Sequence, residues 1–175
     1  MLYKLEGDLL KIVKKINNIV FSIEKLLAIL LAIGLLVSLA AGVFFRYVLK
    51  SPLFWSDELA IFCLIWITFI GGSLSLKEKA SPSITILTDL VPIKYKKYVQ
   101  ALSHIILLVF VAYILYLAIV WISMPSILVQ TSTAMNIPKI YFYFSIPVSF
   151  VFSVFHVLAN IIIDFSDSEQ EESLQ

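Results

Sequence analysis

The chain has 175 residues, of which 61% are hydrophobic and 14% are charged. Soluble domains average roughly 45–50% apolar and about 25% charged residues, so a chain this short has no soluble interior that can hide the excess, and it must face lipid. This excludes a soluble enzyme. A net charge of +1 indicates no nucleic-acid or other polyanionic partner. The single cysteine, Cys63, excludes an internal disulfide and a thiolate metal site.

Residues 1–20 are predicted to form an amphipathic helix on the inner surface of the membrane. Apolar residues recur there at a spacing of three to four, with charged residues on the opposite face. A cytoplasmic extension of the first membrane span is the alternative. The segment is not a cleavable signal peptide, because Glu6 and Asp8 interrupt the apolar run and no small-residue cleavage site follows.

Residues 21–165 are predicted to form an all-α membrane domain with four transmembrane helices. A helix needs about 20 apolar residues to cross the hydrocarbon core, and four segments meet this length: 26–45, 59–76, 98–124 and 140–163. Residues 166–175 form an acidic tail that we expect to be disordered, because no large apolar residues cluster there.

The basic residues predict which way the helices run. Residues 1–25 carry five lysines and the connection 77–97 carries five more, whereas the other two connections hold three basic residues between them. Cytoplasmic connections are rich in Lys and Arg. Both termini are therefore predicted to lie in the cytoplasm, with the connections 46–58 and 125–139 on the outer side.

The four predicted spans contain no Asp or Glu. Acidic residues are costly inside a bilayer and are usually kept there for function, so their absence argues against a self-sufficient proton pump or a small multidrug antiporter. The ionisable residues inside the spans are His104 and His156, at similar depth. They could ligate a b-type haem. The favoured alternative is that each forms a hydrogen bond across the helix bundle, because no further histidine pair exists to continue an electron path.

Small residues at four-residue spacing indicate close packing of the first two spans. We also expect Pro147 to kink the fourth span, because proline frees the carbonyl of Tyr143. The predicted helix-packing positions are Gly34, Ser38, Gly42, Gly71, Gly72, Ser75 and Pro147.

The connection between the first two spans carries the densest polar pattern. Arg46 ends the first span, Pro52 sets a turn, and Trp55 suits a membrane interface. Asp57 and Glu58 occupy the first turn of the next helix, where the helix dipole favours acids. In an ordinary helix hairpin, Arg46 would pair with one acid. Because there are two, we expect the other to pair with a basic residue of another chain.

These residues resemble the small membrane subunit, the Q subunit, of tripartite ATP-independent periplasmic (TRAP) transporters. The resemblance rests on Arg46-x5-Pro52-Leu53-x-Trp55-Ser56-Asp57-Glu58-Leu59, on Trp66 and Phe69-Ile70-Gly71-Gly72, and on the later run Thr133-Ala134-Met135-Asn136-Ile137-Pro138. Ile61 departs from the family, in which a basic residue is frequent at this position.

The resemblance implies a non-catalytic subunit of the bacterial inner membrane that needs no cofactor. It would act as a scaffold for a separate large membrane subunit, which binds sodium and an organic acid delivered by a periplasmic binding protein. The residues predicted to contact the large subunit are Arg46, Pro52, Trp55, Asp57, Glu58 and Trp66. A haem-binding redox subunit and an unrelated membrane assembly factor are the alternative functions.

Overall fold

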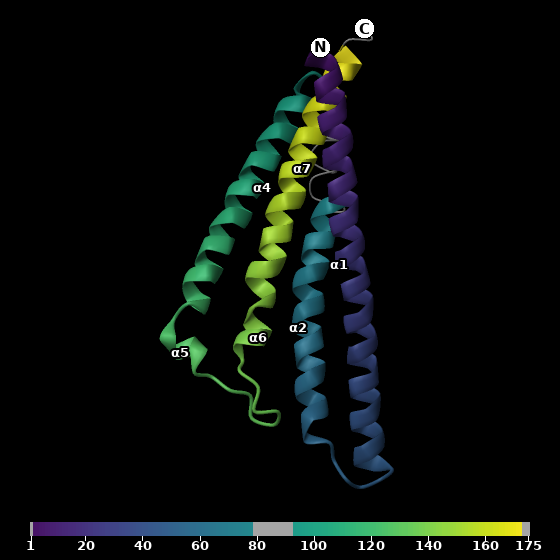
Figure 1. Ribbon diagram of the computed structural model, residues 1–175, viewed down its shortest axis with the longest axis vertical. Helices are drawn as coiled ribbons and strands as arrows, with labels where there is room; N and C mark the ends of the chain where they lie inside the picture. Colours follow the sequence, from purple (N-terminus) through teal and green to yellow (C-terminus); the bar gives the residue numbers. More distant parts are fainter. Residues whose placement is uncertain (1, 79–92, 173–175) are drawn as a thin grey trace.

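The computed structural model describes residues 2–78 and 93–172, and over these parts the protein is all-helical. Four long helices, α1 (Leu2–Tyr47), α2 (Phe54–Lys77), α4 (Ile93–Ile122) and α7 (Ser145–Glu172), run side by side (Figure 1). Two short helices, α5 (Pro125–Leu128) and α6 (Ile140–Tyr143), lie in the connection between α4 and α7.

The predicted four-helix membrane architecture is confirmed. Four apolar stretches are long enough to cross a bilayer, namely Leu10–Tyr47 in α1, Phe54–Lys77 in α2, Ala101–Ile122 in α4 and Ile140–Asp164, which runs from α6 into α7. Both ends of the chain lie at the same end of the bundle (Figure 1). We call this the terminal end, and we call the opposite end, which carries the connections 48–53 and 129–139, the loop end.

The N-terminal segment differs from the expectation. It is not a separate amphipathic helix, because α1 continues without a break from Leu2 to Tyr47. At about 1.5 Å per residue, this 46-residue helix is roughly 70 Å long, more than twice the thickness of the hydrocarbon core. The physical reason is that one face of this segment packs against the rest of the bundle, where Asn17 and Glu24 are buried.

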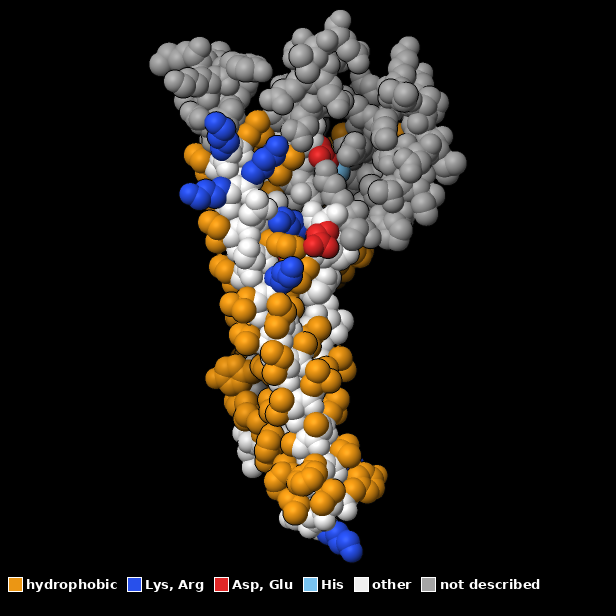
Figure 2. All heavy atoms as spheres, turned by 90° about the vertical axis from the view of Figure 1, so that its right-hand side faces the viewer, with side chains coloured by type: hydrophobic (Ala, Val, Ile, Leu, Met, Phe, Trp, Pro, Cys, Tyr) orange, Lys and Arg blue, Asp and Glu red, His pale blue; other side chains and the backbone are white. Residues whose placement is uncertain are grey.

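Helix α7 organises the bundle because it contacts α1, α2 and α4, and α1 also packs along α2. The interior is polar for a protein of this composition: serines, both histidines, Asn17, Glu24 and Asn160 are buried. Large apolar side chains cover the outside instead. In Figure 2 the middle of the visible face is apolar, and basic side chains gather toward the terminal end. This distribution suits a surface that faces lipid.

The fourth span is interrupted at Phe144, which separates α6 from α7. Pro147 lies in the first turn of α7, where its missing N–H costs little because that N–H would have no helical partner. At the other end, α7 continues to Glu172, through most of the segment expected to be disordered. Glu and Gln are good helix formers, so they extend a helix that is already nucleated. Residues 173–175 lie outside the described part of the chain.

Candidate functional site

A carboxylate clasp at the loop end joins two segments that are far apart in the sequence. Glu58, in the second turn of α2, accepts hydrogen bonds from the Ser132 and Thr133 hydroxyls and from the backbone amides of Ala134 and Met135. The Thr133, Ala134 and Met135 donors lie 2.8–2.9 Å from the carboxylate oxygens. Both oxygens of Glu58 are therefore engaged by the same short loop.

The loop that holds Glu58 is itself a small hairpin. Thr131 and Pro138 pair as an isolated antiparallel bridge, Ser132 N donates to Ile137 O at 2.8 Å, and Lys139 N donates to Gln130 O at 2.9 Å. Asn136 closes the turn with a φ of 53°, a left-handed conformation that asparagine tolerates better than most residues. This folding turns the amides of residues 134 and 135 toward α2.

Asp57 and Arg46 form the predicted ion pair, with Arg46 Nη2 3.0 Å from Asp57 Oδ2. Both side chains are exposed, Arg46 at 49% and Asp57 at 64%. Glu58 is not left without partners, because the chain itself supplies hydrogen-bond donors to its carboxylate. The expected pairing of one acid with a basic residue of another chain stays a prediction. Pro52 and Trp55 are exposed at this corner, the latter at 42%.

Trp66 lies on the side of α2 that faces the fourth span. Its indole N–H donates to the backbone carbonyl of Tyr141 at 3.1 Å, and its neighbour Phe62 contacts Phe142 edge-on with ring centroids 5.1 Å apart. These contacts attach α6 to α2, one to two helical turns from Glu58 toward the terminal end. Trp66 thus has a partner within this chain.

The small-residue stripe of the first span packs against α2 within the same chain. Ser38 Oγ donates to Ser56 O at 2.6 Å, in the buried contact between the helices. A side chain at Gly42 would meet Ser56 Oγ at 2.7 Å, and one at Gly34 would meet Cys63 Sγ at 3.3 Å. The expected close packing is present here. It is absent at Gly71 and Gly72, where an added Cβ meets nothing within 4 Å.

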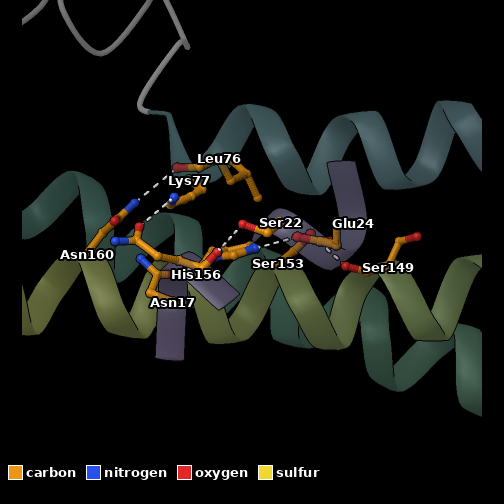
Figure 3. A network of polar contacts seen from close by, with 10 residues as sticks. Asn17, Ser22, Glu24, Leu76, Lys77, Ser149, Ser153, His156 and Asn160 are labelled. Atoms are coloured by element: carbon orange, nitrogen blue, oxygen red, sulfur yellow. Dashed lines mark hydrogen bonds and ion pairs between the residues drawn. The ribbon is translucent and has the colours of Figure 1, made fainter. Parts of the chain in front are cut away.

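A second polar cluster lies toward the terminal end, between α1 and α7 (Figure 3). His156 Nε2 lies 2.6 Å from Glu24 Oε2, and His156 Nδ1 lies 2.6 Å from Asn17 Oδ1. Nearby, Asn160 donates to the Leu76 carbonyl at 3.0 Å, which ties α7 to the end of α2. Lys77 donates to Asn18 Oδ1 at 2.9 Å and lies 3.7 Å over the ring of Phe21.

Both histidines are engaged with acids. His104 Nε2 on α4 lies 3.6 Å from Asp164 Oδ2 on α7. Both ring nitrogens of His156 are held by polar side chains, which leaves neither of them for the iron of a haem in this arrangement. Among the described residues, no group of three or more His, Cys, Asp or Glu side chains could hold a metal ion.

Sequence reasoning missed the partners in this cluster. The predicted first span begins at residue 26, directly after the charged pair Glu24–Lys25, so Glu24 lies inside the predicted membrane domain but outside the predicted span. The helix instead runs through both residues and turns Glu24 inward, while Lys25 is exposed. A signal was available on the fourth span, where buried polar residues recur every three or four positions: Ser145, Ser149, Ser153, His156 and Asn160.

The sequence matches the family described as tripartite ATP-independent periplasmic transporters, DctQ component, over residues 35–167. It is 27% identical over 152 residues to the sialic acid TRAP transporter small permease protein SiaQ of Vibrio cholerae, covering 87% of this chain and 85% of that protein. It is also 27% identical over 146 residues to a putative TRAP transporter small permease protein of Haemophilus influenzae, covering 81% and 86% respectively.

A third relative is much longer than this chain. The isethionate TRAP transporter permease protein DctMQ of Oleidesulfovibrio alaskensis is 28% identical over 96 residues, which are 55% of this chain and 15% of that protein. The family match includes α2, the carboxylate clasp and most of α7. The chain therefore belongs to the DctQ family and is a small permease subunit of a TRAP transporter, a non-catalytic, multi-pass membrane component.

Proposed function

We propose that this subunit is the membrane scaffold of a three-part importer, in which a separate large permease carries sodium and an organic acid and a periplasmic protein delivers that acid. Three features support a scaffold role. The helices present large apolar side chains outward. Most polar side chains between the helices are hydrogen-bonded within the chain. The carboxylate clasp holds the loop end together. A rigid four-helix unit of this kind offers a stable surface for a moving partner.

Association with a large permease is supported by the long relative from Oleidesulfovibrio alaskensis, whose name, DctMQ, joins the letters M and Q. The match to this chain covers only 15% of that protein. A large and a small permease that work together can be joined in one polypeptide. We infer that the present chain makes the corresponding contact between two separate polypeptides. Exposed Pro52 and Trp55 beside the Arg46–Asp57 pair form the corner that we propose touches the large permease.

We propose that the partner proteins, and not this subunit, recognise the transported molecule. The relatives named for sialic acid and for isethionate both carry organic anions in their names, which supports an anionic substrate. We propose the bacterial inner membrane as the location, with both termini in the cytoplasm, because the basic residues concentrate toward the terminal end (Figure 2).

Co-purification tests the scaffold role. The chain is expressed with the large permease encoded beside it, an affinity tag is placed on this chain, and the complex is isolated in lipid nanodiscs. We expect a stable one-to-one complex. Trp55→Ala should reduce the yield of complex, whereas Tyr116→Ala, an exposed aromatic residue on α4, serves as the matched control. Recovery of this chain alone, under conditions in which the large permease is intact, would contradict the proposal.

A further inference from the structure

Glu24 and His156 are two ionisable side chains with no exposed surface. They come from different helices, 132 positions apart in the sequence, and their contact lies in the interior between α1 and α7 (Figure 3). Asn17, two helical turns before Glu24 on α1, holds the other nitrogen of the same ring. One face of α1 therefore engages both nitrogens of His156.

Asn17 fixes the tautomer of the imidazole. An amide oxygen only accepts hydrogen bonds, so His156 Nδ1 must carry a hydrogen. The 2.6 Å separation of Nε2 and Glu24 Oε2 then requires one hydrogen between them. With none, a nitrogen lone pair would face a carboxylate, and with two, an N–H would face an O–H. In both one-hydrogen forms, imidazolium with carboxylate or imidazole with carboxylic acid, the net charge of the pair is zero.

We propose that Glu24 and His156 form a binding site for one shared proton, and that this proton clamps α1 to α7. Loss of the proton leaves a buried negative charge, and gain of a second leaves a buried positive charge. Either charge is costly without a partner. Glu24 Oε1 has no hydrogen-bond donor among the described residues, so that oxygen offers no means of stabilising an extra negative charge.

The neighbouring charged groups already have contacts of their own. From α2, Lys77 is hydrogen-bonded to Asn18 and lies over Phe21, and it is also close enough to Glu24 for the two charges to attract each other. Further along α7, Asp164 lies beside His104 of α4. On α1, Lys25 follows Glu24 but is exposed. Within the direct contact, the shared proton makes the Glu24–His156 pair neutral, and Lys77 adds an attraction to Glu24 from outside the pair.

The clamp accounts for the path of the N-terminal half of α1. The amphipathic pattern there would suit a helix lying flat on the membrane, but the Glu24–His156 pair holds this half of the helix against α7. This inference is independent of the transport role and of which side of the membrane the terminal end faces.

Nitrogen NMR on the full chain in nanodiscs tests the proton position. The sequence contains only two histidines, so ¹⁵N-histidine labelling gives few signals, and the variant His156→Gln assigns them. We expect His156 Nδ1 to carry hydrogen throughout the range from about pH 5 to about pH 9. A His156 ring with an unprotonated Nδ1 at neutral pH overturns the proposal, whatever the variants do.

Thermal unfolding across the same pH range tests the clamp. His156→Gln leaves Glu24 without its proton donor or acceptor and should lower the unfolding temperature by roughly 10 °C near neutral pH. The wild type should become less stable at alkaline pH, where loss of the shared proton leaves a buried negative charge. Glu24→Gln keeps a neutral hydrogen bond to His156, so its unfolding temperature should fall less than that of His156→Gln and should not decline at alkaline pH. Lys25→Gln is the exposed control.

The double variant, Glu24→Gln with His156→Gln, supplies the decisive comparison. Because His104 and Asp164 remain in both proteins, the difference between its pH profile and that of the wild type isolates the Glu24–His156 pair. For the double variant we expect the unfolding temperature to depend less on pH than in the wild type. We also expect it to fall by less than in His156→Gln alone. Strictly additive losses, or an unchanged pH profile, would overturn the clamp.

Discussion

At two levels of the helix bundle, one glutamate joins segments that are distant in the chain. Glu58 attaches the loop around residues 132–135 to α2, and Glu24 attaches α1 to α7. The surroundings of these two acids differ. The clasp around Glu58 is half-buried and built largely from fixed backbone and hydroxyl donors, whereas Glu24 is fully buried against a titratable ring.

Glu58→Gln should release the hairpin. A carboxylate accepts hydrogen bonds at both oxygens, but an amide offers one acceptor oxygen and an NH₂ group that repels the donors. We expect hydrogen exchange of the Ala134 and Met135 amides to accelerate by about tenfold or more, because local opening exposes them to water. Mass spectrometry of deuterium uptake in the wild type and the variant measures this change.

The control for this experiment is Asp57→Asn, at the adjacent position. Asp57 pairs with Arg46 at an exposed site, where ion pairs contribute roughly 0–1 kcal/mol. Its loss should leave exchange at the hairpin unchanged. The adjacent acids Asp57 and Glu58 are thus expected to contribute very unequally to the structure of the loop end. Equal acceleration of hydrogen exchange in the two variants would show that the clasp is not formed in the membrane.

At the scale of helices, the contact between α1 and α2 depends on small residues. The Ser38 hydroxyl bonds directly to the Ser56 carbonyl, which requires the two backbones to approach closely. Gly42 allows the same approach one turn further along, beside Ser56. Without side chains at this position, α1 and α2 can remain in contact up to the connection at residues 48–53.

Gly42→Ala should weaken this contact. Its new methyl group would lie 2.7 Å from Ser56 Oγ, and overpacking of this kind costs about 1–3 kcal/mol. Gly71→Ala is the matched control, since its methyl group meets nothing within 4 Å and alanine favours the helix by roughly 1 kcal/mol. Unfolding of both variants in increasing denaturing detergent should show Gly42→Ala less stable, and Gly71→Ala as stable as the wild type or more so. The reverse order would mean that α1 and α2 pack through another face.

For the whole molecule, the arrangement of four spans places both termini on one side (Figure 1). The excess of lysines on that side predicts that it is cytoplasmic. Cysteine labelling in intact cells tests this orientation, after Cys63 is replaced by alanine. A cysteine replacing Lys50, in the exposed connection between α1 and α2, should react with an impermeant maleimide, whereas one replacing the exposed Lys11 should not.

Membrane permeabilisation supplies the control for the labelling experiment, since it should make the Lys11→Cys variant reactive. Labelling of Lys11→Cys and protection of Lys50→Cys in intact cells would reverse the orientation. It would also place the clasp and its Trp55 corner on the side away from a periplasmic binding protein.

The sequence by itself determined the class of fold, the number of spans and the family. Hydropathy and length are local properties, and they specify a membrane helix without knowledge of its neighbours. The motif around Arg46, Trp55 and Glu58 and the run from residue 133 to residue 138 were likewise visible as two separate patterns. Small residues at four-residue spacing correctly indicated a close helix contact at Gly42.

Only the tertiary structure decided which groups meet. The two motif segments contact each other through Glu58, across 74 to 77 positions of sequence, and the acid buried beside His156 came from outside the predicted span. Spacing along a helix says which residues share a face, but it does not say which neighbour covers that face or how far the helix is rotated. Those choices are made when the helices pack, because buried ionisable groups such as Glu24 and His156 then find partners on other segments.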